Sequence, residues 1–145
     1  MSIFKRCLRN EKGFTMIEMM VVLIIIAVLI AGGIKFYLGN IEKSKLSRAR
    51  MELYNMAAIL DAYYAETGQY PANESEAIEK AGLPEDEDSN SGERKLIKNP
   101  WGKNYEYTGG TGTYKIEAND GDIVKVYAEG NNGKSIVEYG PPPED

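Results

Sequence analysis

The stretch GFTMIEMMVVLIIIAVLIAGGI, residues 13–34, decides how this chain is organised. A short basic segment precedes it, and a long pattern of helical period follows it. Residues 19–34 contain no charged side chain, so this run can enter a bilayer as a helix. Glu18 is the exception, because placing a charged side chain in a membrane costs about 2.5–3.5 kcal/mol on insertion scales. We therefore predict that Glu18 is functional and has a positively charged partner.

The charges are unevenly distributed along the 145 residues. The formal net charge is −5, and residues 1–13 carry +3, since four basic side chains face only Glu11. The remaining residues therefore carry −8. A basic head before an apolar run stays in the cytoplasm, which predicts that the rest of the chain is exported. The acidic character of the exported part argues against nucleic acid as a partner.

A cleavable secretory signal peptide is one alternative for residues 1–34. The run 19–34 has 16 residues, which is a little long for the apolar part of a signal peptide. No A-x-A-like cleavage site follows it, because Gly32 and Gly33 lead directly into Ile34 and Lys35. The pattern therefore fits a signal peptide poorly.

Residues 12–18, KGFTMIE, closely resemble the prepilin processing site of type IV pilins and type II secretion pseudopilins. In that family a membrane peptidase cuts after the glycine, and the new N-terminal residue is N-methylated. The resemblance implies a cut between Gly13 and Phe14, with Phe14 as the N-methylated mature terminus. Glu18 then stands where the family has its glutamate. The implied partners are the prepilin peptidase, the inner-membrane assembly machinery and minor pilins or pseudopilins.

Such a cut removes the basic head and leaves the apolar helix joined to the exported domain. The helix can leave the bilayer only when a bundle of identical helices, a self-associated helical filament, receives it. Glu18 then needs a positive partner, because an unpaired buried charge is very unfavourable. The natural partner is the new α-amino group of Phe14 on a neighbouring copy; the alternative is that Glu18 only reaches the membrane interface.

Lys35 stands where many members of the family have a proline, so the chain departs from the family pattern here. Gly32 and Gly33 lie just before this position. Two adjacent glycines lower helix propensity by about 1 kcal/mol each relative to alanine. We expect a weak point in the helix there.

After an apolar segment at 14–39, residues 40–67 continue the helix in amphipathic form. Apolar side chains at three- and four-residue steps predict one buried face, made of Leu46, Ala49, Leu53, Met56, Leu60 and Tyr63. The opposite face is predicted to be polar, with intrahelical pairs such as Glu42 with Lys45; its other members are Lys43, Ser47, Arg48, Arg50, Glu52 and Asp61. Gly68 stands where a C-terminal cap glycine is expected.

Residues 68–145 are predicted to form a small polar domain. A short helix over 74–81 is expected, capped by Asn73 or Ser75 and stopped by Gly82. Residues 84–92 are predicted to form a solvated acidic loop.

Residues 99–105, NPWGKNY, resemble a segment of the major pseudopilin of type II secretion. Asn99 stands in place of that segment's aspartate, and Asn104 in place of its second proline. Independently of any family, Pro-Trp-Gly makes a turn, and Trp101, the only tryptophan, is expected to anchor it to the core.

Alternating apolar and polar residues predict strands around Tyr105 and Tyr107, at 114–119, at 123–128 and at 135–139. Residues 129–133 separate the last two. The predicted fold class is α+β. A long N-terminal α-helix, transmembrane in its first half and amphipathic in its second, packs on a small antiparallel β-sheet of three to four strands.

Calcium is the one cofactor that the resemblance suggests, because major pseudopilins bind it in a loop of this sheet. The oxygen ligands that this chain offers are Asp120, Asp122, Asn131 and Asn132. They include few carboxylates for a tight calcium site. The alternative is that all four are ordinary turn residues of hairpin loops.

The composition argues against an enzyme. The chain has no histidine, and its single cysteine, Cys7, lies in the basic head. It also has no nucleophile motif such as G-x-S-x-G. Asp120, Asp122 or Glu66 could act as acid–base groups only in a pocket that shifts their pKa values.

The sequence therefore indicates a structural filament subunit made as a single-pass precursor in the bacterial inner membrane, with its N-terminus in the cytoplasm. Both a periplasmic type II secretion pseudopilus and an extracellular type IV pilus fit. A membrane-anchored periplasmic or extracellular binding module that does not polymerise is the alternative from another functional class.

Overall fold

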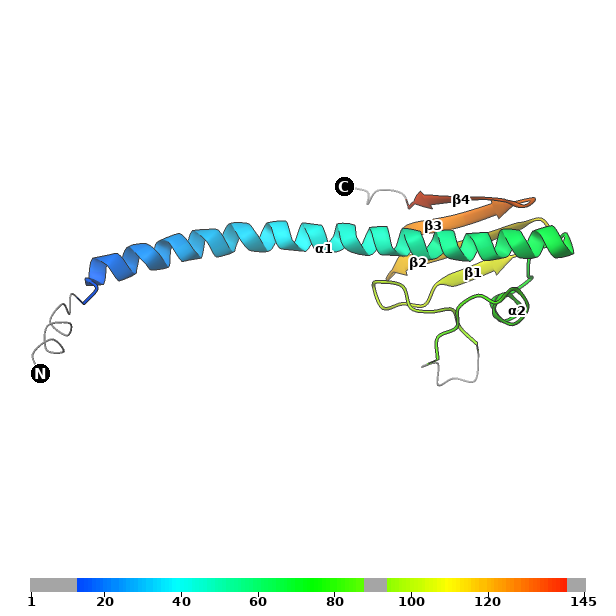
Figure 1. Cartoon of the computed structure of the whole chain (residues 1–145), viewed down its shortest axis with the longest axis horizontal. Helices are drawn as coiled ribbons and strands as arrows, with labels where there is room; N and C mark the ends of the chain where they lie inside the picture. Colours follow the sequence, from blue (N-terminus) through cyan, green and yellow to red (C-terminus); the bar gives the residue numbers. More distant parts are fainter. Residues whose placement is uncertain (1–12, 88–93, 141–145) are drawn as a thin grey trace, which may run out of the picture. The chain divides into compact units, whose positions relative to one another are not determined.

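The computed structural model describes residues 13–87 and 94–140. The predictions for the basic leader, including Cys7, and for part of the acidic loop therefore lie outside the described residues. The chain divides into two compact units, Met1–Ile41 and Glu42–Asp145. Helix α1, Met16–Thr67, contributes residues to both (Figure 1).

In the first unit, α1 begins at Met16, two residues after the predicted start at Phe14. Its apolar side chains are exposed, from 42% at Met19 to 86% at Met16. So long an exposed apolar surface indicates that a membrane or another protein covers it. Within the described ranges, α1 is the one helix long and apolar enough to cross a membrane. It continues through Gly32 and Gly33, so the weak point expected there does not interrupt the helix.

The second unit contains a four-stranded antiparallel sheet with the strand order β1-β2-β3-β4 (Figure 1). The strands are β1, Glu106–Gly109; β2, Thr113–Asp120; β3, Ile123–Asn131; and β4, Lys134–Tyr139. A register shift between Ala118 and Asn119 marks a bulge in β2. The predicted α+β fold is confirmed.

One face of this sheet packs on the part of α1 that belongs to the same unit. Tyr107, Ile116 and Ala128 lie opposite one another on β1, β2 and β3, and all three are buried. They mark the covered face, because successive residues of a strand point to opposite faces of the sheet. The helix meets them with the predicted apolar face, whose buried members are Ala49, Leu53, Met56, Ala57 and Leu60. Burying one leucine or methionine side chain stabilises by about 1.5–3 kcal/mol, so this face holds the helix to the sheet.

The connection between β3 and β4 is shorter than predicted. Residues 129–131 belong to β3, and only Asn132 and Gly133 form the turn. Both have positive φ, 48° and 82°. A two-residue Asn-Gly turn of this kind matches the twist of the flanking strands, which explains why pairing extends to the turn.

Between α1 and the sheet, the chain has the predicted helix end at Gly68 and the predicted short helix. Gly68, with φ 77°, ends α1. The expected short helix is present as one α-turn, α2 (Glu74–Glu76), followed by a π-helical turn, η1 (Ala77–Ala81). Asn73 is the cap, since its Oδ1 accepts the Glu76 N–H at 2.9 Å.

Asn99 organises the Pro-Trp-Gly turn from inside the domain, where it is only 4% exposed. Its Oδ1 accepts the backbone N–H groups of Trp101 and Lys103, at 3.0 and 3.2 Å. Its Nδ2 donates to the carbonyl of Asn119 at 2.9 Å, which ties the turn to the end of β2. An aspartate has no donor for this last bond.

Glu42, predicted to pair with Lys45 along the helix, instead contacts the domain. Both of its oxygens lie 3.3 Å from the indole N–H of Trp101. The Lys125 ammonium lies 3.6 Å from its Oε1. The half-buried Trp101 is therefore anchored to α1 as well as to the core that it touches.

Glu52 and Asp61 also leave the predicted solvent-facing role. Glu52 accepts the hydroxyl of buried Tyr105 at 2.7 Å. Asp61 accepts hydroxyls from Tyr70 at 3.0 Å and Ser135 at 2.7 Å. These bonds join α1 to Tyr70, Tyr105 and β4, and they supply an acceptor for the hydroxyl of the buried Tyr105.

Candidate assembly site at the start of the long helix

The predicted processing and assembly residues lie together at the first turn of α1. Gly13, Phe14 and Thr15 precede the helix in a non-helical conformation, and Glu18 lies one turn inside it. Thr15 is the N-terminal cap, because its carbonyl accepts the Met19 N–H at 3.3 Å. Gly13 and Phe14 are exposed, and no atom of the described residues lies within 4 Å of the Gly13 Cβ position.

Thr15 and Glu18 form a reciprocal capping box. Glu18 Oε2 accepts both the Thr15 N–H, at 2.8 Å, and the Thr15 hydroxyl, at 2.9 Å. In return, Thr15 Oγ1 accepts the Glu18 N–H at 3.3 Å. This arrangement satisfies donors at the helix start, which have no partner within the helix, and holds the carboxylate in one orientation.

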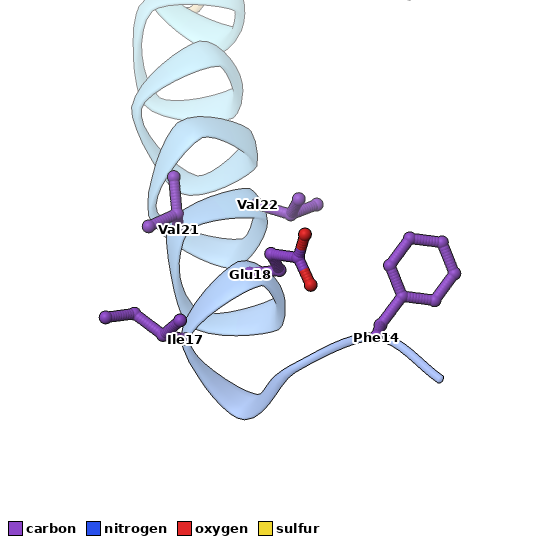
Figure 2. Close-up of a pocket in the computed structure, with 5 residues that line it drawn as sticks. All are labelled: Phe14, Ile17, Glu18, Val21 and Val22. Carbon is purple, nitrogen blue, oxygen red and sulfur yellow. The ribbon is translucent and has the colours of Figure 1, made fainter. Parts of the chain in front are cut away.

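The carboxylate lies in apolar surroundings. Glu18 lines a hollow with Phe14, Ile17, Val21 and Val22. Figure 2 shows the carboxylate on the side of the helix where Phe14 and Val22 lie. Phe14 is 80% exposed, so its ring leaves this hollow open to another molecule.

The second carboxylate oxygen remains available in this arrangement. Among residues 13–87 and 94–140, no group donates a hydrogen bond to Glu18 Oε1. A carboxylate accepts at both oxygens, so Oε1 can take an ammonium hydrogen bond while Oε2 keeps its bonds to Thr15. The site can therefore cap its own helix and bind a cation from outside at the same time.

The sequence reasoning identified Gly13, Phe14 and Glu18 but missed Thr15. The signal was present: a threonine followed three residues later by a glutamate, directly before an apolar run, is the sequence signature of a capping box. It was overlooked because Glu18 was considered only as an isolated charge in a membrane segment.

The four residues considered for calcium do not form a common site. Asp120 and Asp122 lie at the β2–β3 turn, and Asn131 and Asn132 at the β3–β4 turn. β3 separates these turns, and its nine residues span about 27 Å. The Lys125 ammonium, a competing cation, lies 3.9 Å from Asp120. These residues do not fit a calcium ion, and the part of the chain that the structure describes contains no cluster of three or more acidic, histidine or cysteine side chains suited to a metal.

Comparison with known families gives two matches that together cover most of the chain. Residues 8–34 match the family described as prokaryotic N-terminal methylation motif. Residues 36–135 match type II secretion system protein G. The first match contains the capping box and the Gly13–Phe14 bond, and the second contains β1 to β3 and the start of β4.

Individual relatives agree with these matches. The type II secretion system core protein G of Vibrio cholerae serotype O1 is 31% identical over 133 residues, which cover 87% of this chain and 86% of that protein. The protein of the same name from Pseudomonas aeruginosa is 30% identical over 135 residues, covering 88% and 90%. No solved structure matches the chain.

Proposed function

This chain belongs to the protein G family of the type II secretion system, and we propose that it is cut between Gly13 and Phe14 and polymerises with Glu18 paired to its neighbour. It is a pseudopilin, a structural subunit of a pseudopilus filament that is processed from a prepilin-type precursor. The observation that carries the pairing is the open Oε1 of Glu18, which stays free while Oε2 is bonded to Thr15, the residue directly after Phe14.

Hydrolysis of the Gly13–Phe14 bond leaves a carboxylate on Gly13 and a new amino group on Phe14, which is charged near neutral pH. N-methylation keeps this group cationic. The capping box survives the cut, because its donors, the Thr15 amide and hydroxyl, lie on the retained side. The Glu18 carboxylate then accepts a hydrogen bond from the Phe14 ammonium of an incoming copy. The pair neutralises both charges as they leave water.

The exposed apolar part of α1 supplies the driving force for this polymer. In the precursor, lipid covers these side chains, and the single-pass orientation follows from the basic residues before Gly13. In the filament, the same segments of neighbouring copies cover one another. The helix therefore lies in the inner membrane, with the domain in the periplasm, until it moves into the filament during assembly.

The proposed partners follow from this course. They are the prepilin peptidase, the inner-membrane assembly machinery, minor pseudopilins and further copies of this chain. No catalytic role is proposed, since the site supplies one carboxylate that binds and orients charge and no group that attacks a substrate. Calcium is not assigned a role, because its four candidate ligands lie apart.

The test replaces Glu18 with alanine in the chromosomal gene of the native host. We expect Glu18→Ala to be cut nearly as well as the wild type, which mass spectrometry of the mature N-terminus measures. Assembled multimers, trapped by chemical cross-linking in intact cells, should be lost or irregular in size. The matched control is Glu66→Ala, which removes an exposed carboxylate at the far end of α1. Normal multimers from Glu18→Ala would refute the pairing.

Two comparisons with the wild type separate the remaining readings. A processed chain that is never recovered in multimers would indicate a membrane-anchored binding module instead of a subunit. Deleting the gene should abolish secretion of enzymes without removing long surface filaments. Loss of long surface filaments would favour an extracellular pilus instead.

A further inference from the structure

A cluster of one cation and three large side chains lies on the surface where α1 meets the edge of the sheet. We call it the Arg50 patch, and it consists of Arg50, Met51 and Tyr54 on α1 and Tyr139 on β4. The last three are 63%, 49% and 52% exposed. Arginine and tyrosine are enriched among the residues that carry most of the binding energy at interfaces.

Arg50 lies against two aromatic rings, and no carboxylate of the described residues pairs with it. Its guanidinium carbon lies 5.5 Å from the ring centre of Tyr54 and 5.2 Å from that of Tyr139. Two long hydrogen bonds reach the hydroxyls of these tyrosines, at 3.3 and 3.4 Å. Its Nε is buried and has no hydrogen-bond partner among the described residues. By contrast, the neighbouring Arg48 binds Glu52 within the same helix.

A guanidinium has five donors and is suited to a carboxylate that approaches in its plane. The two aromatic rings fix that plane and remove the entropy that a free arginine would lose on binding. The Arg50 patch therefore has the composition and the preorganisation of a carboxylate-binding surface.

The charge distribution of the unit indicates where that carboxylate comes from. Residues 42–50 carry four basic side chains and one acidic one, a net charge of +3. Residues 51–145 carry 19 acidic and eight basic side chains, a net charge of −11. The basic end of one copy is therefore complementary to the domain of another copy.

The domain offers a pair of acidic side chains on the face of the sheet that points away from α1. Glu106 on β1 lies directly across from Glu117 on β2, and both point away from α1, since Tyr107 and Ile116 point toward it. Like charges directly opposite each other on a sheet are destabilising. Lys115 lies 2.6 Å from Glu117, but no cation of the described residues pairs with Glu106.

We propose that the Arg50 patch of one copy binds the Glu106–Glu117 pair of a second copy of this chain. The proposal rests on the function proposed above and adds a contact between globular parts to the contact at Glu18. The two surfaces lie toward opposite edges of the sheet, β4 and β1 (Figure 1). An interface between two different surfaces of identical subunits can repeat along a helix without closing on itself, as a filament requires.

The test exchanges the two charges in the full chain in its native host. We expect Arg50→Glu and Glu106→Arg each to lower the amount of multimer that chemical cross-linking recovers from intact cells about tenfold, a change that corresponds to about 1.4 kcal/mol. The double variant should recover most of the wild-type amount. The matched control, Lys43→Glu, reverses an exposed cation of the same helix that is outside the patch, and it should change the amount less than twofold.

Processing at Gly13 and the membrane level of each variant show whether the chain is made and folded. Single variants that assemble normally, or a double variant that stays as defective as both singles, would overturn the proposal. Equal losses from Lys43→Glu and Arg50→Glu would also overturn it, because net charge alone would then explain them. A wild-type chain that is neither cut nor assembled would instead refute the proposed function, so the two failures are distinguishable.

The acidic residues Glu144 and Asp145, outside the described part of the chain, are another source of a carboxylate. A chain that ends at Gly140 tests them. If the contact is between copies, removing residues 141–145 leaves the loss caused by Arg50→Glu and its rescue by Glu106→Arg unchanged. If Arg50→Glu has no effect in the shortened chain, the occupant is this chain's own C-terminal segment, and the proposal is wrong.

Discussion

Replacing Asn99 by aspartate changes one atom of the side chain, and the structure predicts a large effect on stability. The carboxylate keeps the shape of the side chain and can still accept the N–H groups of Trp101 and Lys103. It loses the Nδ2 donor to the Asn119 carbonyl, and it brings a negative charge to a site that is 4% exposed. Two acceptors then face each other at a distance set by a 2.9 Å hydrogen bond.

The magnitude follows from these contacts. A buried acceptor without its hydrogen bond costs about 1–3 kcal/mol, and the two N–H donors to the new carboxylate offset part of the added charge. We therefore expect Asn99→Asp to lower the free energy of unfolding by about 1–3 kcal/mol at neutral pH. In a domain of this size, that corresponds to a fall in melting temperature of about 4–20 °C.

The fluorescence of Trp101 provides the assay, because it is the only tryptophan and lies two residues from the substitution. Urea unfolding of the full chain in detergent would compare the wild type, Asn99→Asp and the control Asn131→Asp. The control makes the same chemical change on an exposed side chain and should cost less than about 0.5 kcal/mol.

The pH dependence gives a second criterion. A protonated aspartate carries an O–H donor that can replace the lost bond to Asn119. A carboxylate destabilised by about 1–3 kcal/mol in the folded chain takes up its proton about 1–2 pH units above the unfolded value of about 4, so the difference from the wild type should shrink as the pH falls from about 6 to about 4. Equal stability of Asn99→Asp and the wild type at neutral pH would refute the account of Asn99 as a donor. A deficit that does not shrink in acid would show that charge and hydrogen bonding are not its cause.

Two further predictions concern the contact between the sheet and the helix. Gly130→Ala would place a Cβ 2.1 Å from the buried ring of Tyr114, so we expect a loss of about 1–3 kcal/mol in thermal unfolding; Gly110→Ala, where no atom lies within 4 Å, is the control and should be nearly neutral. Burial raises the pKa of Tyr70 from 10.0 to about 12. Between these values the folded chain keeps a proton that the unfolded chain loses, so stability should fall as the pH rises from 10 to 12, and Tyr70→Phe should reduce that slope. Full stability of Gly130→Ala, or an unchanged slope in Tyr70→Phe, would contradict these assignments.

Much of the fold could be predicted because its signals are local and periodic. Leucines and alanines at helical spacing predicted the buried face of α1, and alternation along β2 and β3 predicted which face of the sheet is covered. Gly68 was also a reliable signal, because its left-handed conformation is costly for other residues. The β3–β4 loop was predicted too long, because an Asn-Gly pair was read as part of a loop and not as a complete turn.

The roles of single polar residues could not be predicted in the same way. Glu42, Glu52 and Asp61 were all assigned to the solvated face of α1, since periodicity shows which residues are polar but not which groups lie within reach. Each accepts a hydrogen bond from a residue at least nine positions away in the chain. The importance of Asn99 likewise depends on the end of β2 being beside it.

By itself the sequence determined the long helix, the position of its apolar half and the unusual place of Glu18, and it predicted the cut after Gly13. These depend on neighbours within a few residues, where composition and spacing carry the information. The tertiary structure decided that the four residues considered for calcium lie at two separate turns and that Arg50 contacts two tyrosines but no carboxylate of the described residues. Both depend on which distant segments the sheet brings together, and hydrophobic periodicity leaves that arrangement of polar groups undetermined.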